Sequence, residues 1–419
     1  MKNYFRTLTF WKAAATVIIV AGVYSTIYRF TQGLGAATHL SDEFPWGIWI
    51  GFDILCGVGL AAGGFTLAAI VHIFHIKRFE PILRPTILTA FMGYLLVIFG
   101  LMFDLGRPLQ IWHALIMWNP RSVMFEVAWC VMLYTTVLAL EFSPVLLEKF
   151  GLVRAQKVMR KFTLPLIIIG VLLSTLHQSS LGSLYLIVPE KLYGLWYSAY
   201  LPVFFFFSAI AVGCAMIIFE SFMSARTFKK GLETHLLSDI ARVSVVMLAV
   251  YLTMKIADLS ARGMFPLLIE PRTETYLYWL EMTVGVIAPL VLFSSHRVRD
   301  SRQGLFGGAV LIILGFMLNR MNISITGMEG WAGVTYFPSW MEISITLMIV
   351  TTGFIVFSLA AKHLPLFSHG ENGPQSRGEP AGPVTGTHPM VDDFGEDLKR
   401  LSQPASATSY GGSHEIRFR

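Results

Sequence analysis

Ten long hydrophobic stretches alternate with short polar segments along the first 366 residues. Each has about the 20 mostly apolar residues that a helix needs to cross a bilayer. The predicted spans lie near 11–30, 46–74, 86–103, 123–142, 162–188, 199–225, 238–261, 276–294, 304–320 and 338–361. Lipid offers the backbone no hydrogen-bond partners, and the sequence lacks the alternating segments of about ten residues that are typical of a membrane β-barrel. The pattern therefore predicts an all-α integral membrane protein with about ten transmembrane helices.

The composition changes after the last hydrophobic stretch. Residues 367–419 are rich in Gly, Pro, Ser and charged residues, and such a segment cannot bury a hydrophobic core. The sequence therefore predicts a polytopic membrane domain over 1–366 and a disordered cytoplasmic tail over 367–419.

The basic residues are distributed unevenly between the predicted loops. Only 14% of the residues are charged, against about 25% in soluble domains, and the net charge is +6. Lys and Arg concentrate at 2–12, 77–84, 149–161, 226–242, 297–302 and 362. The positive-inside rule therefore predicts that both termini are cytoplasmic, and the net charge needs no nucleic-acid partner to explain it. A cleaved signal peptide over 11–30 is disfavoured, because its apolar run exceeds the usual length of about 7–15 residues.

The loops predicted on the outer side are rich in Trp, Gly and Pro. Examples are GLGAATHLSDEFPWGIW, DLGRPLQIWHALIMWNPRS and TGMEGWAGVTYFPSW. Two explanations remain open: a docking surface for a protein on the outer face, or the aromatic belt that membrane proteins place at the interface.

Acidic and basic residues interrupt the hydrophobic stretches, mostly toward the predicted outer side. A charge at the bilayer centre costs at least about 2.5–3.5 kcal/mol on insertion scales, so it marks a candidate functional site. The outer-half residues are Asp53, Asp104, Glu126, Lys255, Asp258, Arg262, Glu281, Arg320 and Glu342, with His177 just past mid-membrane, and the cytoplasmic half holds Glu141, Glu220, His72 and His75. Each also has a simple structural interpretation, such as an interface position or, for Lys255 with Asp258, an ion pair. Their one-sided clustering favours a polar cavity near the outer surface.

A quinone site would account for this cavity. Quinone reduction takes two electrons and two protons, so the pocket needs apolar walls, donors for the two carbonyls and carboxylates that exchange protons with water. Tyr94, His177, Glu126 and Asp104 have the required side chains.

Two other classes of protein remain as alternatives. A di-haem cytochrome b needs four axial histidines, but only His72, His75 and His177 lie in spans or at their ends. A secondary transporter is suggested by the glycines of GVGLAAGG at 57–64, which would suit a broken helix, although close helix packing explains them equally well. Cys56, Cys130 and Cys214 lie within spans without a CxxC motif, so no metal or iron–sulfur site is expected.

Several motifs in order resemble a known family. They are FPWGIWIGFDILCGVGLAAGGF (44–65), FDLGRP (103–108), RSVMFEVAWC (121–130), TLHQSSLGSL (175–184) and YFPSW (336–340). The chain resembles the NrfD/polysulfide-reductase membrane subunits over essentially all of residues 1–366, and it is most similar to the HybB-type branch found in periplasmic nickel–iron hydrogenases.

This resemblance implies a fold and a function. Family members form two four-helix bundles flanked by an extra helix at each end of the chain. They carry no haem or iron–sulfur cluster of their own and anchor an outer-face electron-transfer module, usually a ferredoxin-like iron–sulfur subunit. Electrons pass to menaquinone or ubiquinone near the outer surface of the bacterial inner membrane. Because FDLGRP is closer to the general family pattern, the complex could contain a hydrogenase or another periplasmic redox enzyme.

The family match and the residue chemistry together give a set of candidate site residues. Tyr94 in FMGYLL and Glu126 in FEVAWC match family positions linked to quinone chemistry and proton transfer. The predicted quinone-binding residues are Tyr94, His177 and Asp104. The predicted proton-transfer residues are Glu126, Asp53, Asp258, Lys255, Glu141 and Glu220.

Overall fold

The computed structural model describes residues 10–228 and 231–364, so the predicted tail over 367–419 lies outside the described residues. Ten helical segments in this part are long and apolar enough to cross a membrane. Three are single α-helices in the first half of the chain, α2 (Phe10–Gln32), α6 (Glu80–Asp104) and α8 (Val123–Lys149), and α9 (Val153–Ser183) continues into η5 (Leu184–Ile187). The later single helices are α10 (Leu201–Phe228), α11 (Thr234–Ala261) and α17 (Trp340–His363). The ten-span, all-α prediction is confirmed.

The remaining three spans are interrupted helices. The second span consists of η1 (Trp49–Cys56), α4 (Gly57–Leu60), α5 (Gly63–Ala68) and η2 (Ala69–Ile73). The eighth joins α12 (Thr273–Met282), η7 (Thr283–Ile287) and α13 (Ala288–Ser294), and the ninth joins α15 (Arg302–Met321), η8 (Asn322–Thr326) and α16 (Gly327–Ala332). The segments η1, η2, η7 and η8 are π-helical. Such turns inside α-helices are frequent at functional sites.

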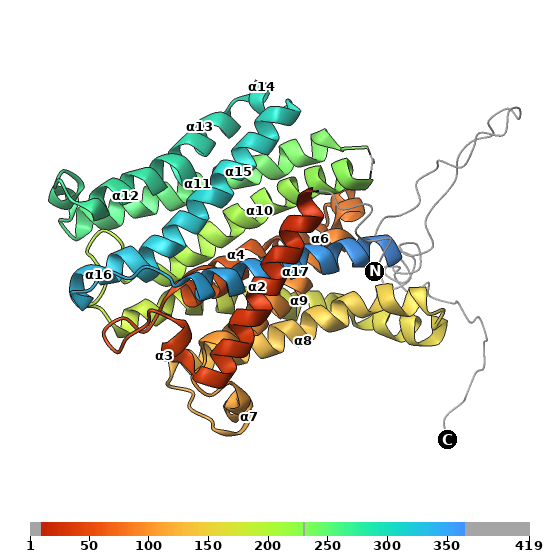
Figure 1. The fold of residues 1–419 in the computed structure, drawn as a ribbon. Helices are drawn as coiled ribbons and strands as arrows, with labels where there is room; N and C mark the ends of the chain where they lie inside the picture. Colours follow the sequence, from red (N-terminus) through yellow and green to blue (C-terminus); the bar gives the residue numbers. More distant parts are fainter. Residues whose placement is uncertain (1–9, 229–230, 365–419) are drawn as a thin grey trace, which may run out of the picture. The chain divides into compact units, whose positions relative to one another are not determined.

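Eight of these spans form two four-helix bundles, as the family resemblance implied. In the first bundle the second span, α6, α8 and α9 contact one another in a closed ring, and in the second bundle α10, α11, α12–α13 and α15 do so. Helix α10 also packs on α9, α4 and α5, so it joins the bundles. The two extra helices, α2 and α17, lie side by side, and α17 packs against α6 (Figure 1).

The helix bundles have two chemically different ends. The basic end carries the connections near Lys77, Arg84, Lys149 and Arg299, together with α14 (His296–Arg299). The tryptophan-rich end carries the loops between the other spans, including α3 (Leu34–Ala37) and α7 (His113–Ile116), which lie with α16 toward the left and bottom of Figure 1. The sequence predicts that this second end faces outward.

Several helices extend beyond their predicted limits. The third and fifth spans begin at Lys77 and Val153, about nine residues earlier than expected, and α8 continues to Lys149. Hydropathy falls where Lys, Arg and Glu enter the sequence, but these residues are good helix formers, so the helix continues into the polar region.

The glycine-rich segment GVGLAAGG combines a helix interruption with close packing. The helix is broken at Ala61 and Ala62. There α10 approaches so closely that a Cβ atom on Gly213 would lie 2.9 Å from the backbone carbon of Ala62. Both features suggested by the sequence are therefore present. Gly59 and Gly63 pack against the second bundle, whereas Gly57 and Gly64 pack against α6 of their own bundle.

Candidate functional site

Four buried polar side chains meet inside the first bundle. Tyr94 comes from α6, Tyr134 from α8, and Ser174 and His177 from α9. The Tyr94 and Tyr134 rings pack edge to face with centroids 4.7 Å apart, and the centroids of Tyr94 and His177 are 5.6 Å apart. All four side chains are at most 1% exposed. We call this group the tyrosine–histidine cluster.

The polar atoms of this cluster make no hydrogen bond of normal geometry with the protein, although the Ser174 hydroxyl lies near those of Tyr94 and Tyr134. They are the Tyr94 and Tyr134 hydroxyls, the Ser174 hydroxyl and both ring nitrogens of His177. Leaving a buried polar group unsatisfied costs about 1–3 kcal/mol, so native proteins rarely do so without a ligand or ordered water. The cluster can donate several hydrogen bonds to an acceptor such as a carbonyl oxygen.

Two glutamates flank the cluster along the same face of α8. Glu126, Cys130, Tyr134 and Glu141 are spaced by four, four and seven residues, which places them on one helix face. Glu141 has a buried carboxylate oxygen without a partner. Glu126 is exposed near the tryptophan-rich end, roughly 12 Å along the helix from Tyr134 by the rise per residue.

A second group of ionisable residues lies where α6 reaches the tryptophan-rich end. Asp53 in η1 is 6% exposed and accepts a hydrogen bond from Thr346 Oγ1 at 2.8 Å. Asp104 lies close enough to Asp53, Arg29 and Glu342 for their charges to interact, and its Oδ1 is buried without a partner. We call Asp53, Asp104, Arg29 and Glu342 the acidic cluster.

Arg29 and Glu342 have structural as well as electrostatic contacts. Arg29 in α2 donates from Nε to the carbonyl of Phe103 at 2.8 Å and from Nη2 to the carbonyl of Leu105 at 2.7 Å, on either side of Asp104. Glu342 in α17 accepts hydrogen bonds from the backbone amides of Ser339 and His39. These contacts fix α2, α6 and α17 around the carboxylates.

Tyr336 completes the shell around Glu342. Its hydroxyl donates to Glu342 Oε1 at 2.5 Å and accepts from the amide of Ile48 at 3.0 Å. Burial and the neighbouring Glu342 carboxylate raise the pKa of Tyr336 well above its usual range. The phenol therefore stays protonated and keeps donating to Glu342.

A cavity of about 490 Å³ runs between the second span, α6, α10 and α17. Among the described residues that line it, Asp53 and Glu220 are the only ionisable ones. Glu220 is 9% exposed, and its Oε1 has no partner. The cavity therefore leads from the acidic cluster toward the basic end.

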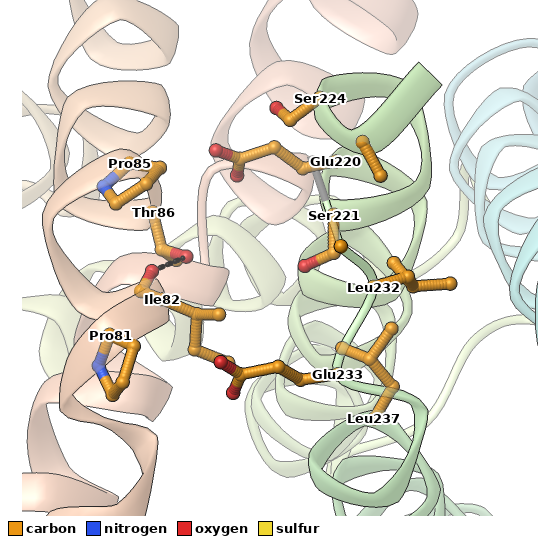
Figure 2. Close-up of a pocket in the computed structure, with 12 residues that line it drawn as sticks. Pro81, Ile82, Pro85, Thr86, Glu220, Ser221, Ser224, Leu232, Glu233 and Leu237 are labelled. Atoms are coloured by element: carbon orange, nitrogen blue, oxygen red, sulfur yellow. Dashed lines mark hydrogen bonds between the residues drawn. The ribbon is translucent and has the colours of Figure 1, made fainter. Parts of the chain in front are cut away.

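A smaller pocket of about 170 Å³ lies at the basic end, and Glu220 and Ser224 line it as well. In Figure 2 the Glu220 carboxylate, from α10, points toward Pro85 of α6. The Glu233 carboxylate, from the segment after α10, points toward Pro81 of α6. Glu220 thus lies between this pocket and the larger cavity.

The second bundle contains a separate charged group. Asp258 pairs with Arg262, at 3.0 Å from Nε and 2.7 Å from Nη2, rather than with Lys255. The ion pair between Lys255 and Asp258 that the sequence suggested is therefore not the one formed, because Arg262 lies one helical turn further along α11 and its guanidinium binds the carboxylate. Lys255 and Asp258 are both buried but lie apart from the tyrosine–histidine cluster.

The structure groups some of the predicted residues and separates others. It brings Tyr94 to His177 and Asp53 to Asp104, whereas Glu126 lies at the surface. Sequence reasoning did not select Tyr134, Ser174 or Arg29, and it counted Glu281 and Arg320 among the outer-half charges without assigning them a role. Two sequence spacings could have identified Tyr134 and Ser174. Tyr134 follows Glu126 by eight residues and Ser174 precedes His177 by three, so each shares a helix face with a residue that was selected.

Comparison with known proteins agrees with this architecture. The family model described as polysulphide reductase, NrfD, matches residues 36–330. A protein of Nitratidesulfovibrio vulgaris is 42% identical over 366 residues, which cover 84% of this chain and 93% of the relative. The probable Ni/Fe-hydrogenase 2 b-type cytochrome subunit of Escherichia coli K12 is 32% identical, covering 83% and 90%.

A third relative carries a quinone in its name. The menaquinone reductase integral membrane subunit of N. vulgaris is 28% identical over 389 residues, covering 85% of this chain and 91% of the relative. These matches confirm the resemblance inferred from the motifs. The chain belongs to the polysulphide reductase NrfD family of multi-pass integral membrane proteins.

Proposed function

We propose that this chain is the quinone-reactive membrane subunit of a respiratory oxidoreductase. It would pass electrons between a partner iron–sulfur subunit and a membrane quinone, with coupled proton transfer. The main observation behind the proposal is the tyrosine–histidine cluster. In it Tyr94, Tyr134, Ser174 and His177 present buried polar atoms that make no hydrogen bond of normal geometry with the protein.

The chemistry of this cluster fits a quinone. The two quinone carbonyls accept hydrogen bonds, and the phenol hydroxyls and an imidazole N–H donate them. The aromatic rings of Tyr94, Tyr134 and His177 also offer faces and edges against which a planar ring packs. The name of the menaquinone reductase relative supports menaquinone as the substrate.

The proton-transfer residues fall into two groups. Glu126 and Glu141, on either side of Tyr134 along α8, would connect the tyrosine–histidine cluster to the two ends of the bundle. Asp53 and Asp104 would exchange protons with Glu220 through water in the larger cavity. We assign Asp104 to this second group rather than to direct contact with the quinone, because it lies with Asp53 and Arg29.

We infer that the partner is a nickel–iron hydrogenase with a ferredoxin-like iron–sulfur subunit. The relative from E. coli supports this choice, although another relative is named as a selenate reductase subunit. The tryptophan-rich end exposes Leu115, Trp118 and Phe337, which suits a docking surface as well as the membrane interface. The positive-inside rule predicts that this end faces outward from the bacterial inner membrane, with the tail over 367–419 in the cytoplasm.

The site can be tested on the complex purified with its native partners. Tyr94→Phe, Tyr134→Phe and His177→Ala should each lower hydrogen-dependent quinone reduction by about fivefold or more, because each removes a hydrogen-bond donor worth roughly 1–3 kcal/mol. Reduction of a viologen dye by the partner should stay unchanged. Tyr24→Phe on the exposed surface of α2 is the matched control. Normal quinone reduction in all three cluster variants would contradict the proposal.

A haem-binding cytochrome is the second candidate, since the name of the E. coli relative contains "b-type cytochrome". The residues do not fit a haem held by two histidines, because His177 is the only buried histidine in residues 10–228 and 231–364. We propose that the chain acts without haem. A visible spectrum of the purified chain decides this: stoichiometric haem bands would overturn the proposal.

A transporter would behave differently in liposomes. It would move a solute without any redox partner, whereas the proposed subunit should show solute movement no greater than empty liposomes.

A further inference from the structure

Helix α9 carries an exposed stripe that is basic at one end and apolar along the rest. Lys157, Lys161, Leu164, Ile168 and Leu172 follow one another at spacings of four, three, four and four residues. Residues at these spacings lie on one face of an α-helix. All five side chains are exposed, and the exposed fractions of the three apolar ones are 45%, 44% and 59%. We call these five residues the α9 stripe.

Two further cations reinforce the basic end of the stripe. Arg154 lies three residues before Lys157 and Arg160 lies three residues after it, so four cations fall within eight residues of α9. The first turn of the helix contains no acidic residue, and no side chain caps it. Like charges at these spacings repel one another, and the positive end of the helix dipole adds to the repulsion. An anion bound beside these cations would relieve it.

The four cations of α9 differ from other cations of the basic end in lacking acidic partners. Arg78 and Arg242 both pair with Asp239, at 2.9 and 2.8 Å, and Arg84 pairs with Glu148 at 3.5 Å. In the part of the chain that the structure describes, none of the four α9 cations forms an ion pair. Their counter-charge therefore has to come from outside these residues.

The position of the cations along α9 matches the headgroup layer of a bilayer. The hydrocarbon core is about 30 Å thick, or about 40–45 Å with the headgroups, which leaves roughly 5–8 Å of headgroup layer on each side. Leu164 begins the continuous apolar run of the helix, and the rise per residue places Lys161 about 4.5 Å and Lys157 about 10.5 Å outside it. In Figure 1 the hairpin that joins α8 to α9 (yellow) extends past the end of α17, so no helix end covers it.

The apolar part of the stripe has about the length of one leaflet. Leu164 and Leu172 are separated by eight residues, or about 12 Å along the helix, against about 15 Å for half of the hydrocarbon core. Helix α9 packs on α8 and α10 through its other faces. A phospholipid presents the same order of groups, with a phosphate at the headgroup followed by an acyl chain.

We propose that the α9 stripe is a binding site for an anionic phospholipid. The headgroup phosphate would contact Lys157 and Lys161, and one acyl chain would lie along the apolar part of the stripe. A lipid with net negative charge fits better than a zwitterionic one, because the cationic group of a zwitterionic headgroup would be repelled by the neighbouring Arg154 and Arg160. The proposal goes beyond the proposed quinone reaction and holds whether or not the chain reacts with quinone.

The test uses the full chain in a neutral detergent, titrated with phosphatidylglycerol that carries a photoreactive diazirine in its acyl chain. After irradiation, mass spectrometry measures labelling of residues 164–172. The concentration for half-maximal labelling should be at least about fivefold lower for phosphatidylglycerol than for phosphatidylcholine with the same diazirine. Lys157→Gln combined with Lys161→Gln should raise that concentration about twentyfold for phosphatidylglycerol, because each cation contributes about fivefold.

Arg297→Gln combined with Arg302→Gln is the matched control, since both arginines are exposed at the same end and their loss removes the same charge. This control should label as wild type does. Equal labelling of wild type by the two lipids would overturn the proposal, and so would an equal shift in the control, because either result describes a nonspecific apolar or basic surface. If the double variant of α9 fails to fold, the single variants Lys157→Gln and Lys161→Gln, each with about a fivefold shift, decide the question.

Discussion

Replacing Arg29 by methionine should destabilise the tryptophan-rich end of the molecule, where α2 and α6 meet. The side chain is 3% exposed and makes two hydrogen bonds, at 2.8 Å to the Phe103 carbonyl and 2.7 Å to the Leu105 carbonyl. A hydrogen bond to a charged group contributes about 1.5–3 kcal/mol. The Leu105 carbonyl lies near the surface and regains water in the variant, so we expect a total loss of about 2–4 kcal/mol.

We also expect the effects of replacing Arg29 and Asp104 on stability to depend on each other. Arg29→Met leaves the Asp104 carboxylate without its nearest cation, and Asp104→Asn removes the charge that is left. The double variant should therefore be more stable than the sum of the two single effects predicts, by about 0.5–3 kcal/mol for residues that interact electrostatically. Arg29→Lys should recover only part of the stability, because one ammonium group cannot reproduce the planar fork that reaches both carbonyls.

The assay is reversible unfolding of the purified chain in mixed detergent micelles, followed by tryptophan fluorescence. Arg121→Met, at an exposed position of the same end, is the control and should change the free energy of unfolding by less than about 0.5 kcal/mol. An unchanged stability of Arg29→Met, or strict additivity with Asp104→Asn, would refute the idea that Arg29 holds the two helices and neutralises Asp104.

Two further predictions concern the contact between the bundles and the proton routes. Gly213→Val should lower the free energy of unfolding by about 1–3 kcal/mol, because its side chain meets the backbone of Ala62. Gly307→Val, with open space around the glycine, should cost less in the same unfolding assay. Glu141→Gln and Glu220→Gln should each slow proton-coupled quinone reduction in proteoliposomes while viologen reduction stays normal. Because the two residues lie on separate routes, the double variant should be slower than either single variant. A double variant no slower than the slower single variant would instead place both residues on one route.

The fold was largely predictable because the dominant physical constraint is local. Each span is identified by about 20 consecutive apolar residues, and lipid forces these residues to be helical. The pairing of α2 with α17 was not predictable from hydropathy, because it depends on contacts such as the 2.7 Å approach of Ser25 Oγ to Ser344 Oγ, which are 319 residues apart in sequence. The π-helical turns leave no mark in hydropathy either.

The sequence identified the residues of the candidate site better than it identified the contacts between them. Tyr94 and His177 were selected together, and the structure places them in contact. Asp258 illustrates the limit: Lys255 and Arg262 both lie on the same face of α11, and only the three-dimensional placement shows that Arg262 binds it. Arg29 was not selected from the sequence because it lies near the end of the first span, but its side chain turns inward to the end of α6.

Helix α6 separates the two polar systems of the first bundle. Gly93 lines the cavity that contains Asp53 and Glu220, whereas the adjacent Tyr94 faces Tyr134 and His177 inside the bundle. Consecutive residues of an α-helix point about 100° apart, so one helix can wall both compartments without joining them. A proton that reaches Asp53 from Glu220 is therefore on the opposite side of α6 from one that arrives through Glu141.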